Sequence, residues 1–223
     1  MTLSPEQIWE NWKSNSGPCK GCPHHDDDLH FRPTLTARQS AKVMIVGEDP
    51  NRSSDRTAKN SKEIPELELK QRGDLGQNDN LENVLHNSWP ISRFVKGVIN
   101  NCGLDISEVY LTNQKKCSNI GNGSDKEDEK RARRQCEPYL RDEIEFIDPS
   151  MVILSGKKVI QFVNTEFGLS LSTKPAKNAG TFAEHGKQIY VVAPNFGRFE
   201  GNLAQHSDFS STEEFFSSIK ILL

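Results

Sequence analysis

The sequence contains no long apolar segment that could form a membrane anchor. None of its apolar runs approaches the roughly 20 residues that a membrane-spanning helix needs, and its first residues lack the apolar core of a secretion signal. Hydrophobic residues make up only 34% of the 223 residues, and charged residues make up 26%. These absences exclude a membrane-spanning protein and predict a cytoplasmic one.

A strong excess of positive charge is also missing. The formal net charge is -3 at pH 7, so the chain does not bind nucleic acid through its overall charge, and any DNA-binding face must be local. Neither an internal repeat nor a clear linker divides the sequence, and its length suits one sizeable core. We therefore expect a single domain over residues 1–223. A long polar insertion at about 51–89 interrupts it; this tract is either mobile or gates the substrate.

Cysteine is scarce, and its five residues do not indicate a disulfide framework in a cytoplasmic chain. Cys19 and Cys22 form a Cys-x-x-Cys knuckle between glycine and proline residues, and Cys117 and Cys136 lie far along the chain. Four such thiols can coordinate zinc or hold an iron–sulfur cluster, and their spacing does not separate the two. Alternatively, the two distant thiols are buried apolar residues. Cys102 lies on the inner face of a predicted helix and is expected in the core.

Two histidines and three aspartates follow the knuckle, at residues 24–28. Their side chains could bind a metal as well, but a polar run of this composition is more often a solvated loop. We expect solvent around it.

Residues 42–51 are the stretch around which the rest of the chain is organised. Their four consecutive apolar residues predict a short buried strand that ends at Gly47. Glu48 and Asp49 follow directly, at the carboxyl end of the strand, where open α/β sheets bind their ligands. Two carboxylates there can orient a water molecule or hold the edge of a base. The alternative is an acidic surface turn.

Strands and helices alternate along the remaining chain. Further strands are predicted at 109–113, 151–154 and 188–192. Helices are predicted at 4–14, 92–102, 127–147, 157–166 and 211–222, with a break or kink near Cys136 because Pro138 lies inside the third of them. Polar residues collect at the strand ends: Glu48, Asp49, Asn51, Asn113, Ser155 and Asn195. The pattern predicts a compact α/β domain with one site along one edge of its sheet.

The order of these features resembles the uracil-DNA glycosylase superfamily, and most closely its iron–sulfur branch, family four. The similarity covers nearly the whole chain. Its pieces are Cys19-x-x-Cys22; the strand before Gly47-Glu48-x-Pro50; Val109–Asn113 leading to Lys116-Cys117; Cys136-x-Pro138-Tyr139-Leu140 before Asp148-Pro149; the turn at Gly156; and the last strand before x-Pro194-x.

The resemblance implies a three-layer α/β/α sandwich around a short four-stranded parallel sheet. It also implies a [4Fe–4S] cluster held by Cys19, Cys22, Cys117 and Cys136, with zinc as the alternative. In this family the cluster is structural and fixes loops that face DNA. We expect a monomer that binds DNA containing uracil or a modified pyrimidine.

Three positions depart from the family pattern. Family four has a small residue where this chain has Asp49, which instead resembles the Gly-Gln-Asp-Pro motif of family one, in which the Asp orients the attacking water. Family one continues with a tyrosine that excludes 5-substituted pyrimidines, and this chain has Asn51 there. The usual His-Pro-Ser motif, whose His stabilises the charge on the leaving base, is replaced by Ala193-Pro194-Asn195.

Breaking an N-glycosidic bond leaves positive charge on the sugar and negative charge on the base, after the base has been flipped from the stack. We expect Asp49 to direct water, Glu48 to support it, and the Asn113 amide to read a pyrimidine edge. The other expected base contacts are Gly47, Pro50, Asn51, Trp89 and Asn195. The expected DNA contacts are Lys115, Lys116, Ser155, Lys157, Arg198 and a wedge at Phe196. The Ser155–Lys158 turn opens a helix whose N-terminus suits a phosphate.

The sequence leaves three functions open. The first is a monofunctional DNA glycosylase for a modified or 5-substituted pyrimidine, such as hypermodified cytosine in foreign DNA, in a role of antiviral defence. The second is a conventional uracil-DNA glycosylase of DNA repair. The third is a catalytically silent iron–sulfur protein that binds DNA.

Overall fold

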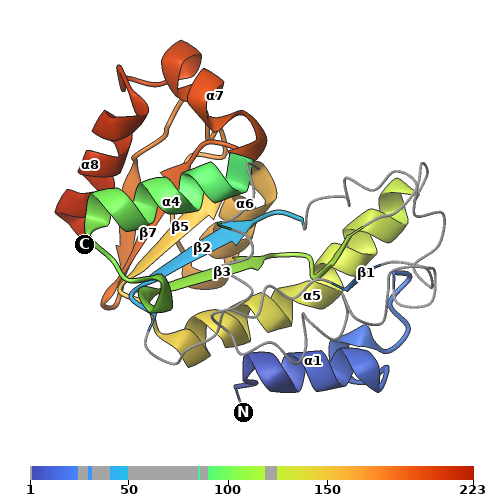
Figure 1. The fold of residues 1–223 in the computed structure, drawn as a ribbon. Helices are drawn as coiled ribbons and strands as arrows, with labels where there is room; N and C mark the ends of the chain where they lie inside the picture. The colour runs from blue at the N-terminus through green and yellow to red at the C-terminus, as the bar shows by residue number, and fades with distance from the viewer. Residues whose placement is uncertain (1, 25–29, 32–40, 50–84, 86–89, 119–124) are drawn as a thin grey trace.

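A central sheet of five strands, in the order β3-β2-β5-β7-β6, organises the fold (Figure 1). The computed structural model describes residues 2–24, 30–31, 41–49, 85, 90–118 and 125–223. Strands β2 (Val43–Gly47), β3 (Val109–Asn113), β5 (Met151–Ser155) and β7 (Gln188–Ala193) are parallel, and β6 (Phe182–His185) pairs with β7 antiparallel. The four parallel strands are the four predicted ones. Strand β6 was not predicted, because its side chains are mostly exposed and lack an apolar run.

Helices cover both faces of this sheet, which confirms the three-layer sandwich. On one face, Val43 and Ile45 pack in a core with α4 (Pro90–Cys102), α7 (Phe199–His206) and α8 (Thr212–Leu222). On the other, Met44 and Val46 pack with α5 (Lys126–Ile147) and α6 (Lys157–Phe167). Because both faces are buried, β2 is a continuous apolar run rather than an alternating one.

Of the break or kink expected near Cys136, the break is absent, because α5 continues through Pro138. A proline inside a helix removes the hydrogen bond to the carbonyl four residues earlier. That carbonyl belongs to Arg134, an exposed residue. On either side of the proline, Cys136, Tyr139 and Leu140 are buried, and their packing outweighs the local cost.

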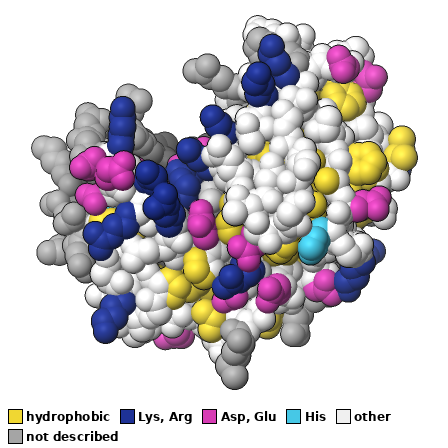
Figure 2. All heavy atoms as spheres, turned by 180° about the vertical axis from the view of Figure 1, so that it is seen from behind, with side chains coloured by type: hydrophobic (Ala, Val, Ile, Leu, Met, Phe, Trp, Pro, Cys, Tyr) yellow, Lys and Arg dark blue, Asp and Glu magenta, His cyan; other side chains and the backbone are white. Residues whose placement is uncertain are grey.

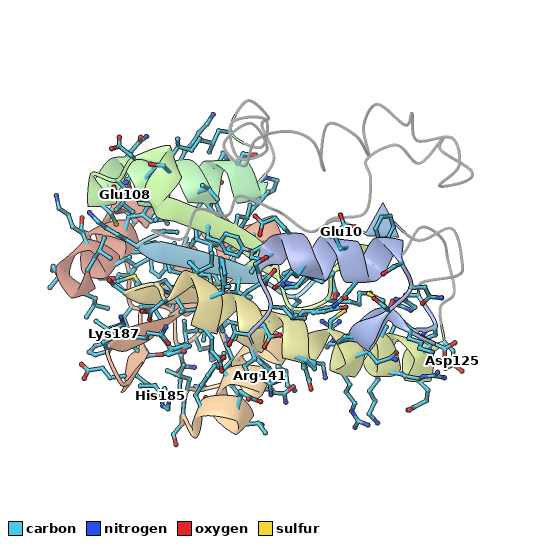
Figure 3. All side chains as sticks on the ribbon, turned by 90° about the horizontal axis from the view of Figure 1, so that it is seen from below. Glu10, Glu108, Asp125, Arg141, His185 and Lys187 are labelled. Carbon is cyan, nitrogen blue, oxygen red and sulfur yellow. The ribbon has the colours of Figure 1, made fainter. Side chains whose placement is uncertain are left out.

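The N-terminal region packs beside α5. Figure 3 shows α1, which carries Glu10, alongside α5, which begins near Asp125. Helix α1 (Pro5–Lys13) begins at Ser4, whose hydroxyl accepts a hydrogen bond from the backbone of Gln7. The short helix η1 (Gly17–Cys19) follows. Strand β1 (His30–Phe31) then pairs antiparallel with β4 (Cys117–Ser118). The knuckle and the segment after β3 are thereby brought together. In the described part of the chain, the other short helices are η3 (Ile106–Glu108) and η4 (Phe196–Arg198).

Within the described ranges, no helix is long and apolar enough to cross a bilayer. The polar insertion predicted at about 51–89 lies almost wholly outside the described residues, apart from residue 85.

Candidate active site and thiol centre

The candidate site lies where the chain changes direction across the sheet. Strand β2 lies between β3 and β5. The connection that leaves β2 leads to β3, whereas the one that leaves β5 leads to β7 on the opposite side, so the two run in opposite directions. Ligands of open α/β sheets bind at the carboxyl ends of strands at such a point. Pairing continues beyond β2, with hydrogen bonds from Gln114 N to Gly47 O (2.8 Å) and from Lys115 N to Glu48 O (3.0 Å). The backbone of the expected catalytic turn is therefore fixed to the segment that follows β3.

Asn113 and Phe196 both lie against Gly47. A Cβ atom added to Gly47 would be 2.5 Å from Oδ1 of Asn113 and 3.5 Å from Cε2 of Phe196. Only glycine therefore leaves room for the amide in this position. The structure thus brings Gly47, Asn113 and Phe196 together as three of the expected site residues.

Asp49 forms a two-point ion pair with Arg133 of α5. Nη1 of Arg133 is 2.9 Å from Oδ1, and Nη2 donates to Oδ2 at 3.0 Å. Arg133 also donates to the carbonyl of Glu48 at 3.2 Å. Nζ of Lys115 lies 3.9 Å from Oδ1 of Asp49 and 2.7 Å from Oε2 of Glu129. The Asp49 side chain is 39% exposed, so its carboxylate can still be reached from solvent.

Glu48 turns away from Asp49 and caps α6. Its Oε1 accepts a hydrogen bond from the backbone N–H of Lys158 at 2.7 Å. Gly156 makes room for it, because a Cβ there would be 2.3 Å from Cγ of Glu48, and its φ of +112° is one that other residues rarely adopt. A carboxylate of the chain itself therefore binds the helix N-terminus that the sequence analysis assigned to a phosphate.

The structure corrects the expected phosphate contacts of Lys115 and Lys116, because both side chains are buried. Nζ of Lys116 pairs with Oε2 of Glu143 and also donates to Thr112 Oγ1 (2.8 Å) and to the Asn113 carbonyl (2.7 Å). Glu143 in turn accepts from Tyr110 and Thr112. These lysines hold the loop after β3 from inside and do not face solvent.

Ser155 is also an internal contact rather than a DNA contact. It is buried, and its hydroxyl donates to the carbonyl of Pro194 (2.9 Å) and accepts from the backbone of Phe196 (3.3 Å). The ring of Phe196 lies 4.8 Å from that of Phe94 in the core. The ring is half-buried against other side chains, and the wedge role of Phe196 stays a prediction.

The remaining expected residues fall into two groups. Lys157 is exposed at the start of α6, and Asn195 is exposed, with its Oδ1 accepting from the backbone of Gly197 at 3.0 Å. Outside the described residues or side chains lie Pro50, Asn51, Trp89 and the side chain of Arg198. Ala193, which replaces the family histidine, is fully buried beside Ser155 of β5.

Four buried thiols gather between the knuckle, β4 and α5. Burial raises the pKa of Cys136 to about 12 and that of Cys117 well above its usual value, and the charges of Cys136, Cys22 and Cys19 raise that of Cys117 further. Burial also raises the pKa of Cys19, and Tyr139 opposes this through a contact of 3.3 Å between its hydroxyl and the sulfur. The four thiol side chains are thus close enough to interact electrostatically.

The two centres expected at these thiols are a zinc ion and an iron–sulfur cluster. Zinc holds its sulfur ligands at about 2.3 Å from one ion. Among the described residues, no group of three or more Cys, His, Asp or Glu side chains is arranged to hold one metal ion. A cubane cluster binds each thiolate to a different iron and so needs a wider cage of four thiols. The four buried cysteines supply the four thiolates that such a cluster needs.

Helix α5 fixes the knuckle through its backbone. Arg131 donates to the carbonyl of Gly21 (2.8 Å), and Gln135 to that of Lys20 (3.5 Å). Figure 2 shows Lys and Arg side chains gathered on the side where the N-terminal half of α5 lies, with acidic side chains among them. This face therefore carries charges of both signs.

The solvated loop expected after the knuckle is wrong at His24, which is buried. Its two ring nitrogens have no hydrogen-bond partner in the described part of the chain. Burial lowers its pKa, and the charge of Lys115 lowers it further, whereas Glu129, Asp128 and Asp49 act in the opposite direction. His24 therefore lies near the charges around Asp49. His25 and the aspartates lie outside the described residues.

Sequence reasoning missed Arg133, which belongs to a run of basic residues typical of a solvated helix face. Its spacing could have revealed it. Glu129, Arg133, Cys136 and Leu140 follow one another at intervals of three or four residues, which places them on one side of α5. A charged residue on the same stripe as a candidate ligand is expected to face inward.

A mostly parallel sheet covered by helices on both faces, with a carboxylate and an amide at the carboxyl ends of its strands and a thiol centre beside it, defines an α/β/α protein with a site at one edge of its sheet. The family model described as "Uracil DNA glycosylase superfamily" matches residues 33–197, which is more than half of the chain. The chain belongs to this superfamily.

Two curated relatives are similar at low identity. The type-4 uracil-DNA glycosylase of Archaeoglobus fulgidus is 23% identical over 177 residues, covering 78% of this chain and 74% of the relative. That of Sulfurisphaera tokodaii is 23% identical over 192 residues, covering 85% of this chain and 66% of the relative. The similarity to the family-four branch, expected from the cysteine spacing and strand-end motifs, is confirmed.

Proposed function

We propose that this protein is a monofunctional DNA glycosylase that flips out a pyrimidine base and hydrolyses its N-glycosidic bond. The observation that carries the proposal is the arrangement at the ends of β2 and β3. There a partly exposed carboxylate, Asp49, and a half-buried amide, Asn113, occupy one edge of the sheet on neighbouring strands. Superfamily membership and the two type-4 relatives support it.

Asp49 directs the attacking water in this proposal. A carboxylate can accept about four hydrogen bonds, and Arg133 uses only one direction at each oxygen. The remaining lone pairs can hold a water molecule against C1′ of the sugar. The negative charge also stabilises the positive charge that develops on the sugar as the bond breaks. Glu48 supports the turn by fixing it to α6.

Asn113 reads the flipped base. Its amide offers a donor and an acceptor together, which matches the edge of a pyrimidine. Gly47 and the buried Lys116, which donates to the carbonyl of Asn113, hold this residue in place. Ala193 offers no donor to the leaving base. Losing one such donor typically costs about 10²–10³ in rate, so we expect slow release of uracil.

Cys19, Cys22, Cys117 and Cys136 would hold a [4Fe–4S] cluster. When bound, it supplies a covalent crosslink between the knuckle, the segment after β3 and α5, and no redox step is needed for hydrolysis. The residues of the chain itself then keep Lys115 and Arg133 at fixed distances from Asp49. We propose a structural role for the cluster.

The second candidate is a glycosylase that acts on a narrower class of pyrimidines. Asn51 is smaller than the tyrosine that excludes 5-substituted pyrimidines, and Ala193 replaces the histidine suited to uracil. Both changes favour a pyrimidine with a bulky 5-substituent, such as modified cytosine in foreign DNA, and hence a role in defence.

Base release from matched oligonucleotides tests both candidates. Single- and double-stranded substrates would carry uracil, 5-hydroxymethylcytosine or its glucosylated form, and alkali would cleave the abasic sites. Release of any base supports the glycosylase, and release of the bulky bases alone supports the second candidate. If no substrate is cleaved while DNA is still bound, a catalytically silent DNA-binding protein is the better description.

A further inference from the structure

We infer that Arg133 is a positioning residue that sets the direction of the Asp49 carboxylate. This inference rests on the proposed function, since it concerns the same site. The guanidinium bonds both carboxylate oxygens, at 2.9 and 3.0 Å. A planar fork matched to a carboxylate in this way fixes its plane as well as its distance, which a single point charge cannot do.

Arg133 can impose this geometry because its own position is constrained. Its side chain is only 14% exposed, compared with 39% for Asp49. It also donates to the carbonyl of Glu48, the residue before Asp49. Arg133, which is held on a helix, therefore binds the turn at two places: the backbone carbonyl of Glu48 and the carboxylate of Asp49.

The position of Arg133 on α5 links it to the thiol centre. Cys136 lies three residues later, on the same side of the helix, and is buried. Lys115, the second cation near Asp49, lies two residues before Cys117. Each of the two segments that approach Asp49 with a positive charge thus also carries a thiol. Asp49 and Arg133 therefore act as a pair. A small residue at position 49 would have no carboxylate for Arg133 to orient.

The two adjacent arginines of α5 separate positioning from general charge. Arg134 has the same side chain on the same helix but is exposed. Arg133→Gln should lower the single-turnover rate constant for base release about 10- to 100-fold, because a misdirected catalytic group costs up to about 10²-fold. DNA affinity and its salt dependence should stay within about twofold, since no phosphate contact is lost. Arg134→Gln should leave the rate constant unchanged.

Two further variants test that Arg133 acts through Asp49. Arg133→Lys restores the charge without the fork and should have an intermediate rate. In an Asp49→Asn background, Arg133→Gln should cost no more than about twofold further, because residues that act as a unit are not additive. An equal loss in both backgrounds, or loss of DNA affinity rather than of rate, would overturn the inference.

A cycle on the unfolding equilibrium gives a readout that does not depend on activity. Asp49→Asn, Arg133→Gln and the double variant should be non-additive by about fivefold or more in the unfolding constant, as expected for residues in contact. Additive effects would contradict the inference even if no substrate were cleaved. An inactive wild-type protein with a clear coupling would instead contradict the proposed function alone.

Discussion

Oδ1 of Asn113 occupies the space that a Cβ on Gly47 would need, with a separation of only 2.5 Å. The two residues face each other in the parallel register of β2 and β3. Gly47, the last residue of β2, thus determines where the amide of Asn113 at the end of β3 can lie. The glycine is required here by close approach and not by an unusual backbone angle.

Gly47→Ala should therefore move the Asn113 amide and lower base release about 10- to 100-fold, because even a small displacement of a base-reading group is costly. Single-turnover kinetics would measure the effect. Gly201→Ala is the matched control, since a Cβ at Gly201 in α7 meets nothing within 4 Å. Its rate should equal that of the wild type. A fully active Gly47→Ala protein would show that Asn113 does not need this position.

Lys116→Met should destabilise the fold because it leaves Glu143 as a buried carboxylate without its cation. Removing one partner of a buried ion pair typically costs about 3–5 kcal/mol. Chemical denaturation would measure the loss. The double change Lys116→Met with Glu143→Leu should recover part of it. If Lys116→Met instead left stability intact and reduced the salt dependence of DNA binding, the lysine would be a phosphate contact after all.

Glu48→Ala should remove the cap of α6 and lower the free energy of unfolding by about 1 kcal/mol. Glu48→Gln keeps an acceptor oxygen and should cost less. Its base release should remain within about fivefold of the wild type, because its proposed role is to fix the turn. Complete loss of release in a stable Glu48→Gln protein would assign the carboxylate a direct part in the chemistry.

Iron removal should loosen the region beside α5. Anaerobically purified protein should be brown and absorb near ~400 nm, and chelation should lower its melting temperature together with that absorbance. Cys136→Ser should reproduce both effects, whereas Cys102→Ser should not, because Cys102 lies outside the thiol centre. Colourless protein that contains one zinc per chain would refute the iron–sulfur assignment.

The parallel strands were predictable because strands buried on both faces are unbroken apolar runs, as in residues 43–46 and 151–154. The turn after β2 and the two thiol pairs could also be found, since glycine, carboxylate and cysteine spacing carry direct signals. The direction in which a charged side chain points could not be predicted. The sequence suggests solvent-exposed side chains at Lys115, Lys116 and Arg133. The fold brings an acidic partner close to each of them, and these ion pairs keep the side chains away from solvent: Glu129, Glu143 and Asp49.

In the proposed function, Asp49 directs hydrolysis of an N-glycosidic bond. The most direct test is single-turnover release of the free base, identified by mass spectrometry, from a uracil-containing oligonucleotide and from the 5-substituted substrates. Wild-type protein and Asp49→Asn would be compared at equal DNA occupancy. If Asp49 has this role, the wild type yields a free base and an intact abasic strand, with a loss of at least about 10²-fold in the variant. Equal release by both proteins would contradict it.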